Sequence, residues 1–197
     1  NATSVYYYDG EEILLLRNNW GEGVTEARDW PVYPIDFDIG VNEFATDVDF
    51  STRGFSATIT CHTLERQEHL AGFFDRMRGA QGNFWMPTWE NDLPLAGDIV
   101  GESQVLRVSA SRTARLLLDN AVYREIAVVT HSRQVYVNSI LDVEIAGGVA
   151  TLQLRDTWPE NIAMADVLMV SWMPAWRLTG DEQSFLWLTS TVAQVEF

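Results

Sequence analysis

Apolar and polar residues alternate through most of the chain, and turn-forming residues interrupt the alternation about every ten positions. This pattern is typical of an all-β sandwich or barrel. The predicted strands are 12–17, 44–50, 55–61, 104–109, 115–119, 126–130, 134–138, 141–146, 149–154, 166–172, 184–189 and 192–197. The clearest hairpin is DVEIAGGVATLQL, where Gly147 and Gly148 supply positive φ between two alternating runs.

One segment, HTLERQEHLAGFFDRMRGAQG, departs from the alternation and predicts a helix over about 63–78. Thr63 suits the N-cap, and Gly79 suits the end of the helix. One apolar stripe at helical spacing is formed by Leu70, Phe73, Phe74 and Met77. We therefore expect a mainly β fold, an antiparallel β-sandwich or barrel with one amphipathic helix packed on the sheet, in a single domain over 1–197.

The chain contains the pattern W-M-P-x-W twice, at Trp85-Met86-Pro87-Thr88-Trp89 and at Trp172-Met173-Pro174-Ala175-Trp176. Three explanations compete: an internal duplication, an aromatic platform for a sugar, or two equivalent packing positions in the core or at an interface. The halves share no other similarity, since the predicted helix before the first copy has no counterpart before the second. Proline removes a donor from the ladder, which places each copy on an edge strand or a bulge.

The net charge of the chain indicates which classes of partner it is suited to bind. Its formal net charge is −15, and all 13 basic residues are arginines. A protein this acidic does not bind the phosphates of a nucleic acid through the release of counterions, which argues against tight binding of nucleic acid. The same charge suits a wall past which DNA slides without sticking.

Cysteine content and hydropathy indicate where such a chain is made. The only cysteine, Cys61, excludes an intramolecular disulfide and fits a reducing cytosol. No segment reaches the roughly 20 consecutive apolar residues of a membrane-spanning helix. We expect a protein without a membrane anchor that is produced in the cytoplasm.

Metal-binding and nucleophilic sites find no support in the residue spacing. Cys61 and His62 are neighbours in or after a strand, where successive side chains point to opposite faces. His69 and His131 lack a ligand partner at a recognised spacing, and there is no Gly-x-Ser-x-Gly nucleophile motif. We predict no catalytic residue, metal or cofactor, and hence no enzyme.

Two pairs of carboxylates are the remaining catalytic candidates. Asp36 and Asp38, and then Asp47 and Asp49, are each two residues apart and would share one face of a strand. Glycosidases use two carboxylates about 5 to 9.5 Å apart. The simpler interpretation is a solvated edge that discourages pairing between sheets. A glycosidase is kept as the third and least favoured hypothesis.

Two segments resemble a known family. The run LAGFFDRMRGAQGNFWMPTWENDLPL, a predicted helix followed by an aromatic-proline strand and Asn-Asp-Leu, is similar to a segment of tail-tip proteins of long-tailed bacteriophages. The terminal run WRLTGDEQSFLWLTSTVAQVEF resembles the phrase with which such proteins close. The two runs resemble the distal tail protein and minor tail protein family.

The resemblance implies a structural virion protein that forms an oligomeric ring, commonly a hexamer, in the tail tip. Such a ring joins the tail tube to the tail-tip hub and adsorption proteins, and DNA passes through it without specific binding. The protein would be assembled in the host cytoplasm and reside in the virion tail. The alternative hypothesis is a carbohydrate-binding β-sandwich module with an aromatic platform.

The ring hypothesis assigns interface roles to six residues. Aromatic and arginine side chains contribute to interface energy out of proportion to their number. The expected anchors are Trp85, Trp89, Trp172 and Trp176, with Arg76 and Arg78 pairing to an acidic neighbour.

Overall fold

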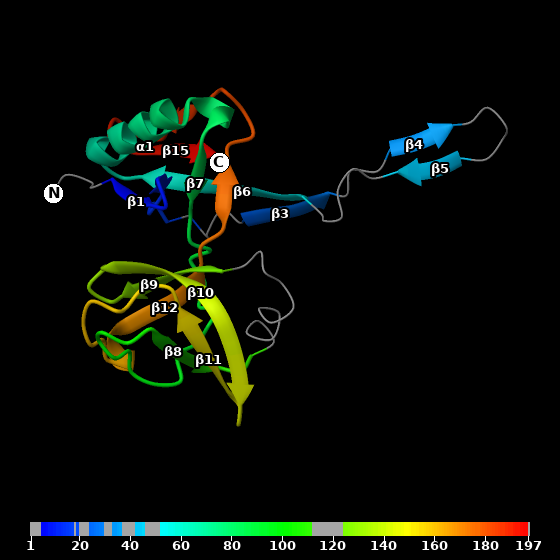
Figure 1. The fold of residues 1–197 in the computed structure, drawn as a ribbon. Helices are drawn as coiled ribbons and strands as arrows, with labels where there is room; N and C mark the ends of the chain where they lie inside the picture. The colour runs from blue at the N-terminus through cyan, green and yellow to red at the C-terminus, as the bar shows by residue number, and fades with distance from the viewer. Residues whose placement is uncertain are drawn as a thin grey trace. The chain divides into compact units, whose positions relative to one another are not determined.

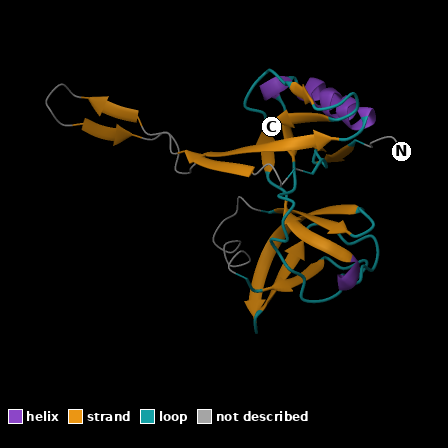
Figure 2. Ribbon diagram, turned by 180° about the vertical axis from the view of Figure 1, so that it is seen from behind, coloured by secondary structure: helices purple, strands orange, loops and turns teal. Residues whose placement is uncertain are grey.

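The computed structural model describes residues 5–17, 19, 24–29, 33–36, 42–45, 52–111 and 124–196. The chain divides into two compact units. The first combines Asn1–Leu15 with Asp75–Asp181, and the second combines Leu16–Phe74 with Glu182–Phe197. Strands dominate, and the described residues contain one α-helix (Figure 1, Figure 2).

A four-stranded sheet in the first unit joins the N-terminal segment to two segments far along the chain. Its order is β1-β2-β7-β13. The strands are β1 (Tyr6–Tyr8), β2 (Glu11–Ile13), β7 (Asn83–Trp85) and β13 (Ala175–Arg177). β2 runs antiparallel to β1 and parallel to β7, and β13 runs antiparallel to β7. β7 is therefore an interior strand of this sheet.

The other sheet of the first unit has five antiparallel strands in the order β12-β9-β10-β11-β8. They are β8 (Val105–Ser109), β9 (Glu125–Thr130), β10 (Val135–Ala146), β11 (Val149–Leu154) and β12 (Val167–Trp172). The first part of β10 pairs with β9, and the part after the register shift at Ile140 and Asp142 pairs mainly with β11. A bulge bends a strand and increases its twist, so this shift lets one long strand serve two partners.

Apolar side chains from all five strands enter one buried cluster, which loop residues complete. The cluster comprises Leu93, Ile99, Leu106, Val108, Ile126, Val128, Ile140, Val143, Ala150, Leu152, Leu154, Trp158, Ile162, Val170 and Trp172. β9 is buried on both faces, because Ala127 on its opposite face packs with Ile13 of the four-stranded sheet. The uninterrupted apolar run 126–129 fits such a strand.

The second unit contains a four-stranded antiparallel sheet in the order β14-β15-β6-β3. Its strands are β3 (Val24–Asp29), β6 (Thr52–Cys61), β14 (Phe185–Trp187) and β15 (Ala193–Glu196). Ala57, Ile59 and Cys61 on β6 are buried, and the residues between them are half-buried. A separate antiparallel hairpin consists of β4 (Tyr33–Asp36) and β5 (Asn42–Ala45).

Helix α1 (Leu64–Met77) lies along the sheet of β6 and β15 (Figure 1, Figure 2). At its N-terminus, Thr63 Oγ1 accepts the backbone N–H of Arg66 at 3.3 Å, as an N-cap does. Leu70 and Phe73 are fully buried, and Gln67 extends the buried stripe by donating its side-chain amide to the carbonyl oxygen of Thr191 at 3.0 Å. Burial of this stripe holds the helix on the sheet.

The helix ends in a tight turn that admits only glycine at one position. Arg78 and Gly79 have φ of 53° and 62°, and the N–H of Gly82 donates to the carbonyl oxygen of Met77 at 2.8 Å. A Cβ on Gly79 would lie 2.5 Å from Oδ1 of Asp181, the same oxygen that accepts the N–H of Ala80 at 2.9 Å. Both the positive φ and the close approach therefore require Gly79.

The predicted fold class, mainly β with one amphipathic helix packed on a sheet, is confirmed. The sheets are sandwich-like, and none of the described sheets closes into a barrel. The helix has the predicted bounds to within a residue, and the Gly147–Gly148 hairpin is present. The predicted strand 115–119 lies outside the described residues.

The single domain predicted over 1–197 stays a prediction, and within the chain two compact units are distinguished. The chain passes between the units after Leu15, after Phe74 and after Asp181, and the second of these crossings lies inside α1. The first crossing lies two residues after β2, and the third lies in the loop between β13 and β14. Pairing between remote segments, rather than a contiguous stretch, defines each unit.

Candidate functional site

The two W-M-P-x-W segments are hydrogen-bonded to each other. Trp85 lies opposite Ala175 in the β7–β13 ladder, and the N–H of Thr88 donates to the carbonyl oxygen of Trp172 at 2.9 Å. The first residue of each copy therefore faces the fourth residue of the other. This reciprocal arrangement is a local twofold relation between two antiparallel segments.

The relation is not complete at the centre of the motif. The N–H of Met86 donates to the carbonyl oxygen of Pro174 at 3.3 Å, but the N–H of Met173 donates instead to the carbonyl oxygen of Glu125 at 2.9 Å. Met173 itself is buried beside Ile13 and Ala127. The second copy is thereby tied to both sheets of the first unit.

The expected edge position is correct for the second copy and wrong for the first. Trp172 ends β12 and Ala175 begins β13, and both strands are edges of their sheets. Trp85 ends β7, which lies between β2 and β13. Pro87 follows the end of that strand, between Met86 and Thr88, whose N–H groups bond the second copy, so its missing N–H removes no bond between the two copies.

The four tryptophans of the motifs differ in exposure. Trp89 and Trp172 are each 8 % exposed, and Trp89 packs with Val129 and Met169. Trp85 and Trp176 are half-buried. The indole N–H of Trp85 donates to the carbonyl oxygen of Tyr8 at 3.0 Å, and the two rings meet edge to face. Within one chain, the four rings do not form an open stacking platform.

The segment after the first copy covers the free edge of β12. Asn91 Oδ1 accepts the N–H of Val170 at 3.1 Å, and Asp92 Oδ2 accepts the N–H of Trp172 at 2.9 Å. The N–H of Leu93 then donates to the carbonyl oxygen of Val170 at 3.1 Å. Side chains and backbone thus occupy the hydrogen-bonding positions of a missing neighbour strand, which blocks pairing with another chain.

The same segment continues to the opposite edge of the five-stranded sheet. Leu95 forms an antiparallel bridge with Val108 of β8. The N–H of Ala96 donates to the carbonyl oxygen of Arg107 at 2.9 Å. Residues 88–96 therefore protect both edges of this sheet. The Asn-Asp-Leu phrase noted in the sequence belongs to this segment.

Arg76 is engaged within the chain. Its guanidinium forms two hydrogen bonds of 2.7 Å with the carboxylate of Glu12, whose side chain is only 2 % exposed. The hydrogen bond to Glu12 raises the pKa of Arg76 further. Arg78 is exposed in the left-handed turn after α1. The chain itself thus supplies an acidic partner of Arg76, and the expected pairing to a neighbouring subunit remains a prediction.

An exposed apolar run among the described residues begins on edge strand β14 and ends one residue beyond it. Leu186, Trp187 and Leu188 are 62 %, 55 % and 52 % exposed. Three consecutive large apolar residues are unusual on a solvated strand and mark a surface for interaction or aggregation. The sequence predicted this strand but not its exposure. The run Phe-Leu-Trp-Leu does not alternate, but an uninterrupted apolar run is also typical of a strand buried on both faces, so it does not by itself indicate exposure.

A charged cluster joins the N-terminal hairpin to the residue after β11. Arg155 donates from Nη1 to Asp9 Oδ2 at 3.0 Å, hydrogen-bonds the hydroxyl of Tyr8, and lies 5.1 Å from the centre of that ring. Burial raises the pKa of Tyr8 to about 12, against the opposing effect of the Arg155 charge. These contacts give Arg155, Asp9 and Tyr8 hydrogen-bond or ion-pair partners within the chain, so we interpret the cluster as structural.

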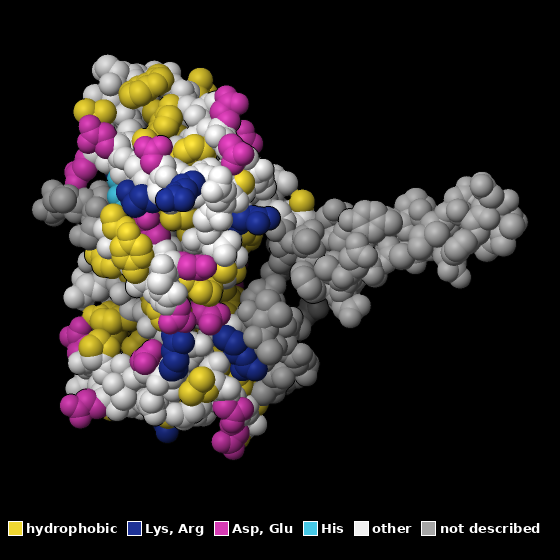
Figure 3. All heavy atoms as spheres, turned by 45° about the horizontal axis from the view of Figure 1, so that its top comes forward, with side chains coloured by type: hydrophobic (Ala, Val, Ile, Leu, Met, Phe, Trp, Pro, Cys, Tyr) yellow, Lys and Arg dark blue, Asp and Glu magenta, His cyan; other side chains and the backbone are white. Residues whose placement is uncertain are grey.

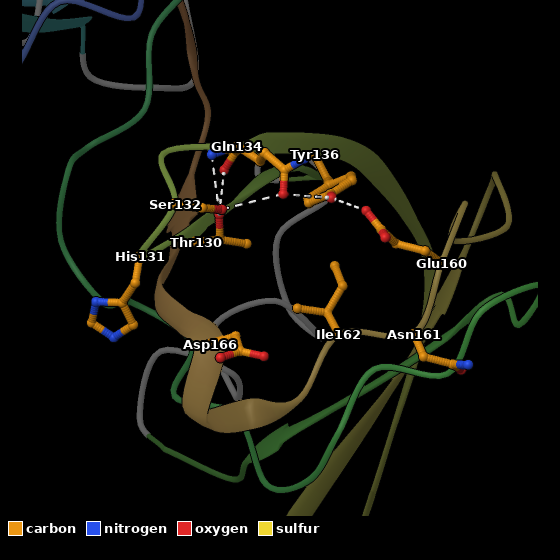
Figure 4. A pocket seen from close by; sticks show the side chains of 9 residues that line it. All are labelled: Thr130, His131, Ser132, Gln134, Tyr136, Glu160, Asn161, Ile162 and Asp166. Atoms are coloured by element: carbon orange, nitrogen blue, oxygen red, sulfur yellow. Dashed lines mark hydrogen bonds between the residues drawn. The ribbon is translucent and has the colours of Figure 1, made fainter.

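A polar pocket of about 200 Å³ lies beside the β9–β10 turn (Figure 4). Its lining consists of Thr130, His131, Ser132, Gln134, Tyr136, Glu160, Asn161, Ile162 and Asp166. A chain of hydrogen bonds runs from Thr130 through Ser132 and Gln134 to Tyr136 and Glu160. Figure 4 shows the imidazole of His131 directed away from this chain. The volume is below the roughly 300 Å³ at which drug-sized pockets begin.

Among the residues that line the pocket, Tyr136 has a pKa that is clearly shifted from its ordinary value. Its hydroxyl donates to Glu160 Oε1, and this hydrogen bond raises the pKa of Tyr136 to about 12. The neutral phenol is therefore stabilised as a donor. With Glu160 and Asp166 on the lining, the pocket suits a neutral hydroxylated ligand better than an anion.

The remaining catalytic candidates are the possible metal ligands, Cys61 and the two aspartate pairs. Among the described residues, no group of three or more His, Cys, Asp or Glu is placed to hold a metal ion. Cys61 is fully buried, and burial raises the pKa of its thiol. Asp38, Asp47 and Asp49 lie outside the described residues, as does the side chain of Asp36.

Two further observations concern the surface and the helix. On the face drawn in Figure 3, acidic and arginine side chains are interspersed with hydrophobic ones, and the acidic ones do not merge into one patch. In the part of the chain that the structure describes, no helix has the length and apolar character needed to span a bilayer.

No protein-family model matches the chain, and no curated protein matches its sequence.

Proposed function

We propose that this protein is a non-enzymatic structural component of a bacteriophage tail that assembles into an oligomeric ring at the tail tip. The ring would join the tail tube to the tail-tip hub and adsorption proteins and let DNA pass. The observation that carries self-assembly is the exposed apolar edge of β14. The phage assignment rests on the resemblance of two runs, LAGFFDRMRGAQGNFWMPTWENDLPL around the first W-M-P-x-W copy and the terminal WRLTGDEQSFLWLTSTVAQVEF.

The electrostatics of the chain support the same proposal. A net charge of −15 disfavours adhesion of DNA to the protein, which a conduit requires. Residues 88–96 protect both edges of the five-stranded sheet, so unwanted edge pairing is blocked in that part of the molecule. β14 lacks such a cover among the described residues, as a surface reserved for assembly would.

Light scattering on the purified protein and electron microscopy test the proposal. We expect a concentration-dependent closed oligomer, seen as rings, and detection of the protein by mass spectrometry in purified phage particles. Antibody labelling should place it at the end of the tail. A protein that stays monomeric at high concentration and is absent from particles would contradict the proposal.

The second candidate function is binding of a carbohydrate, and the polar pocket favours it. Tyr136, Gln134 and Glu160 offer donors and acceptors suited to sugar hydroxyls. We place this candidate at the pocket rather than at the motif tryptophans, since Trp89 and Trp172 are buried. Titration of a glycan panel by calorimetry tests it, with Gln134→Ala as the variant expected to lose binding. No heat with any glycan would remove it.

A further inference from the structure

The hydroxyl groups that line the polar pocket already donate within the chain. The hydroxyl of Tyr136 donates to Glu160. The hydroxyl of Ser132 donates to Gln134 Oε1 at 3.2 Å, and that of Thr130 donates to the carbonyl oxygen of Gln134 at 3.3 Å. Because each hydroxyl proton has an acceptor, these groups can only accept hydrogen bonds from a ligand.

Two carboxylates of the lining have oxygens that remain open to a ligand. Glu160 accepts the hydroxyl of Tyr136 through Oε1, which leaves its Oε2 available. Within the described part of the chain, the carboxylate of Asp166 has no hydrogen bond or ion pair. Figure 4 shows the two carboxylates on different sides of Ile162. Arg133 belongs to the same turn but does not line the pocket, so the lining carries acidic charge without an arginine to offset it.

The nitrogen-bearing side chains of the lining leave few donors for a ligand. Figure 4 shows the imidazole of His131 and the amide of Asn161 directed away from the other labelled side chains. The Oδ1 of Asn161 accepts the N–H of Gly101 at 2.8 Å, which fixes this orientation. The side-chain amide of Gln134 remains as a donor. Acceptors therefore outnumber donors among the side chains of the pocket, and the ligand that fits is itself a donor.

The wall that carries Asp166 is fixed by the backbone. The carbonyl oxygen of Asp166 accepts the N–H of His131 at 2.9 Å, and its N–H donates to the carbonyl oxygen of Ala163 at 2.9 Å. Ile99 and Ile162 form an antiparallel bridge in the same loop region. A site that is already ordered loses less conformational entropy when a ligand binds. Asp166 is thus held in place before binding.

The pocket also offers apolar surface. Ile162 is 6 % exposed, and the ring of Tyr136 is half-buried on the same lining. A sugar ring presents C–H groups on its faces and hydroxyl donors at its edge, so it can contact both kinds of surface. With a volume of about 200 Å³, the pocket suits one ring rather than a chain. The charges of Glu160 and Asp166 favour a ring that also carries a positive group.

We propose that the pocket binds a monosaccharide with a protonated amino group, with the ammonium at Asp166 and ring hydroxyls donating to Glu160 and Gln134. Asp166 takes the ammonium because its carboxylate has no other partner among the described residues, whereas Glu160 already accepts the hydroxyl of Tyr136. The inference rests on the second candidate function, binding of a carbohydrate, and names the class of sugar. It is independent of assembly into a ring.

Titration followed by backbone amide NMR shifts tests the inference on the full chain. The probes are glucosamine, glucose and N-acetylglucosamine at mildly acidic pH, where only glucosamine carries a positive charge. We expect shifts at residues 130–136 and 160–166, and about fivefold tighter binding of glucosamine, as far as a solvent-exposed ion pair allows. Added salt should reduce this preference, because it screens the charges.

Two variants identify the charge responsible. Asp166→Asn keeps the shape of the side chain and removes its charge, and it should bind glucosamine no more tightly than glucose. Glu144→Gln removes one acidic charge at an exposed position of β10, outside the lining, and should keep the full preference. The amide spectrum of each variant away from the pocket shows that it has folded. A preference that survives in Asp166→Asn would overturn the proposal.

The probes also separate this inference from the function on which it rests. Equal affinity for the three sugars would overturn the amino-sugar inference and leave the carbohydrate candidate standing. Binding of n-butylamine as tightly as glucosamine would indicate a site for a plain cation and overturn recognition of the sugar ring. If no sugar shifts a pocket amide, both the inference and the carbohydrate candidate fail.

Discussion

The backbone N–H of Thr88 donates to the carbonyl oxygen of Trp172 at 2.9 Å, which binds the two W-M-P-x-W segments to each other across 84 residues of sequence. Asp92 strengthens this junction. Its Oδ2 accepts both the hydroxyl of Thr88 and the N–H of Trp172. The repeated pattern therefore marks two halves of one junction between the sheets of the first unit.

The junction predicts the effect of replacing Asp92. Asp92→Ala removes the acceptor of a main-chain N–H in a residue that is 8 % exposed. Leaving such a donor unpaired costs about 1–3 kcal/mol, so the free energy of unfolding should fall by that amount. Urea denaturation followed by tryptophan fluorescence measures the change.

The control for this experiment is Asp156→Ala. The side chain of Asp156 is 63 % exposed, and its 3.4 Å contact with Arg155 is a surface pair. Such pairs contribute about 0–1 kcal/mol. Equal losses for the two variants would mean that Asp92 does not hold the junction.

The Arg76–Glu12 pair predicts a larger loss. Arg76→Met keeps an apolar stem but leaves the carboxylate of Glu12, which is 2 % exposed, without its bidentate partner. Removing one partner of a buried pair costs about 3 kcal/mol or more, and the 36 % exposure of Arg76 places the expected loss at that lower end. Thermal and urea denaturation measure it.

Two further variants separate the cause of that loss. Arg78→Met, at the exposed neighbour, should change stability by no more than about 0.5 kcal/mol. The double variant Arg76→Met with Glu12→Gln should recover part of the loss, because the buried charge is gone. If the double variant is no more stable than Arg76→Met, the unpaired charge is not the cause.

How far the sequence could predict this fold depends on strand length and phase. The five-residue strand Val105–Ser109 shows enough alternation to be located within a residue. The strands Tyr6–Tyr8 and Ala175–Arg177 were not predicted, because three positions by themselves cannot display a period. They are strands because remote segments pair with them. The predicted break between 138 and 141 is a register shift inside β10, which changes the phase of the alternation without ending the strand.

The candidate site also combines patterns that are visible in the sequence with contacts that only the topology determines. The W-M-P-x-W copies and Asn91-Asp92-Leu93 were visible as patterns in the sequence. Their pairing depends on which strands become neighbours, and that is a property of the topology. The exposure of Leu186 and Trp187 likewise depends on β14 being the last strand of its sheet. No local pattern states which strand is last.

The hairpin between β10 and β11 predicts unequal tolerance at its two glycines. Gly147 and Gly148 have φ of 58° and 83°, the signs required by a type I′ turn. Asparagine is well accepted at the first position of such a turn, so Gly147→Asn should leave the free energy of unfolding nearly unchanged. Gly148→Val forces a β-branched residue into positive φ and should cost about 1–2 kcal/mol. Urea midpoints of the two variants check the difference, and equal midpoints would contradict it.

The acidity of Tyr136 predicts how stability changes in alkali. Its pKa is raised from 10.0 to about 12 by the hydrogen bond to Glu160, so the folded protein retains a proton that the unfolded chain loses near pH 10. Because the folded state then binds more protons, the contribution of this group to stability is complete below about pH 10 and is lost as pH rises through about 12. Tyr136→Phe has no such proton, and its stability should fall less between about pH 9 and about pH 11.5. Alkaline titration of tyrosinate absorbance should show one fewer late-ionising group in this variant, whereas Tyr6→Phe, at a residue 50 % exposed, serves as the control and should keep it. If Tyr136→Phe loses stability with pH as steeply as the parent protein, the Tyr136–Glu160 hydrogen bond does not hold the phenol neutral.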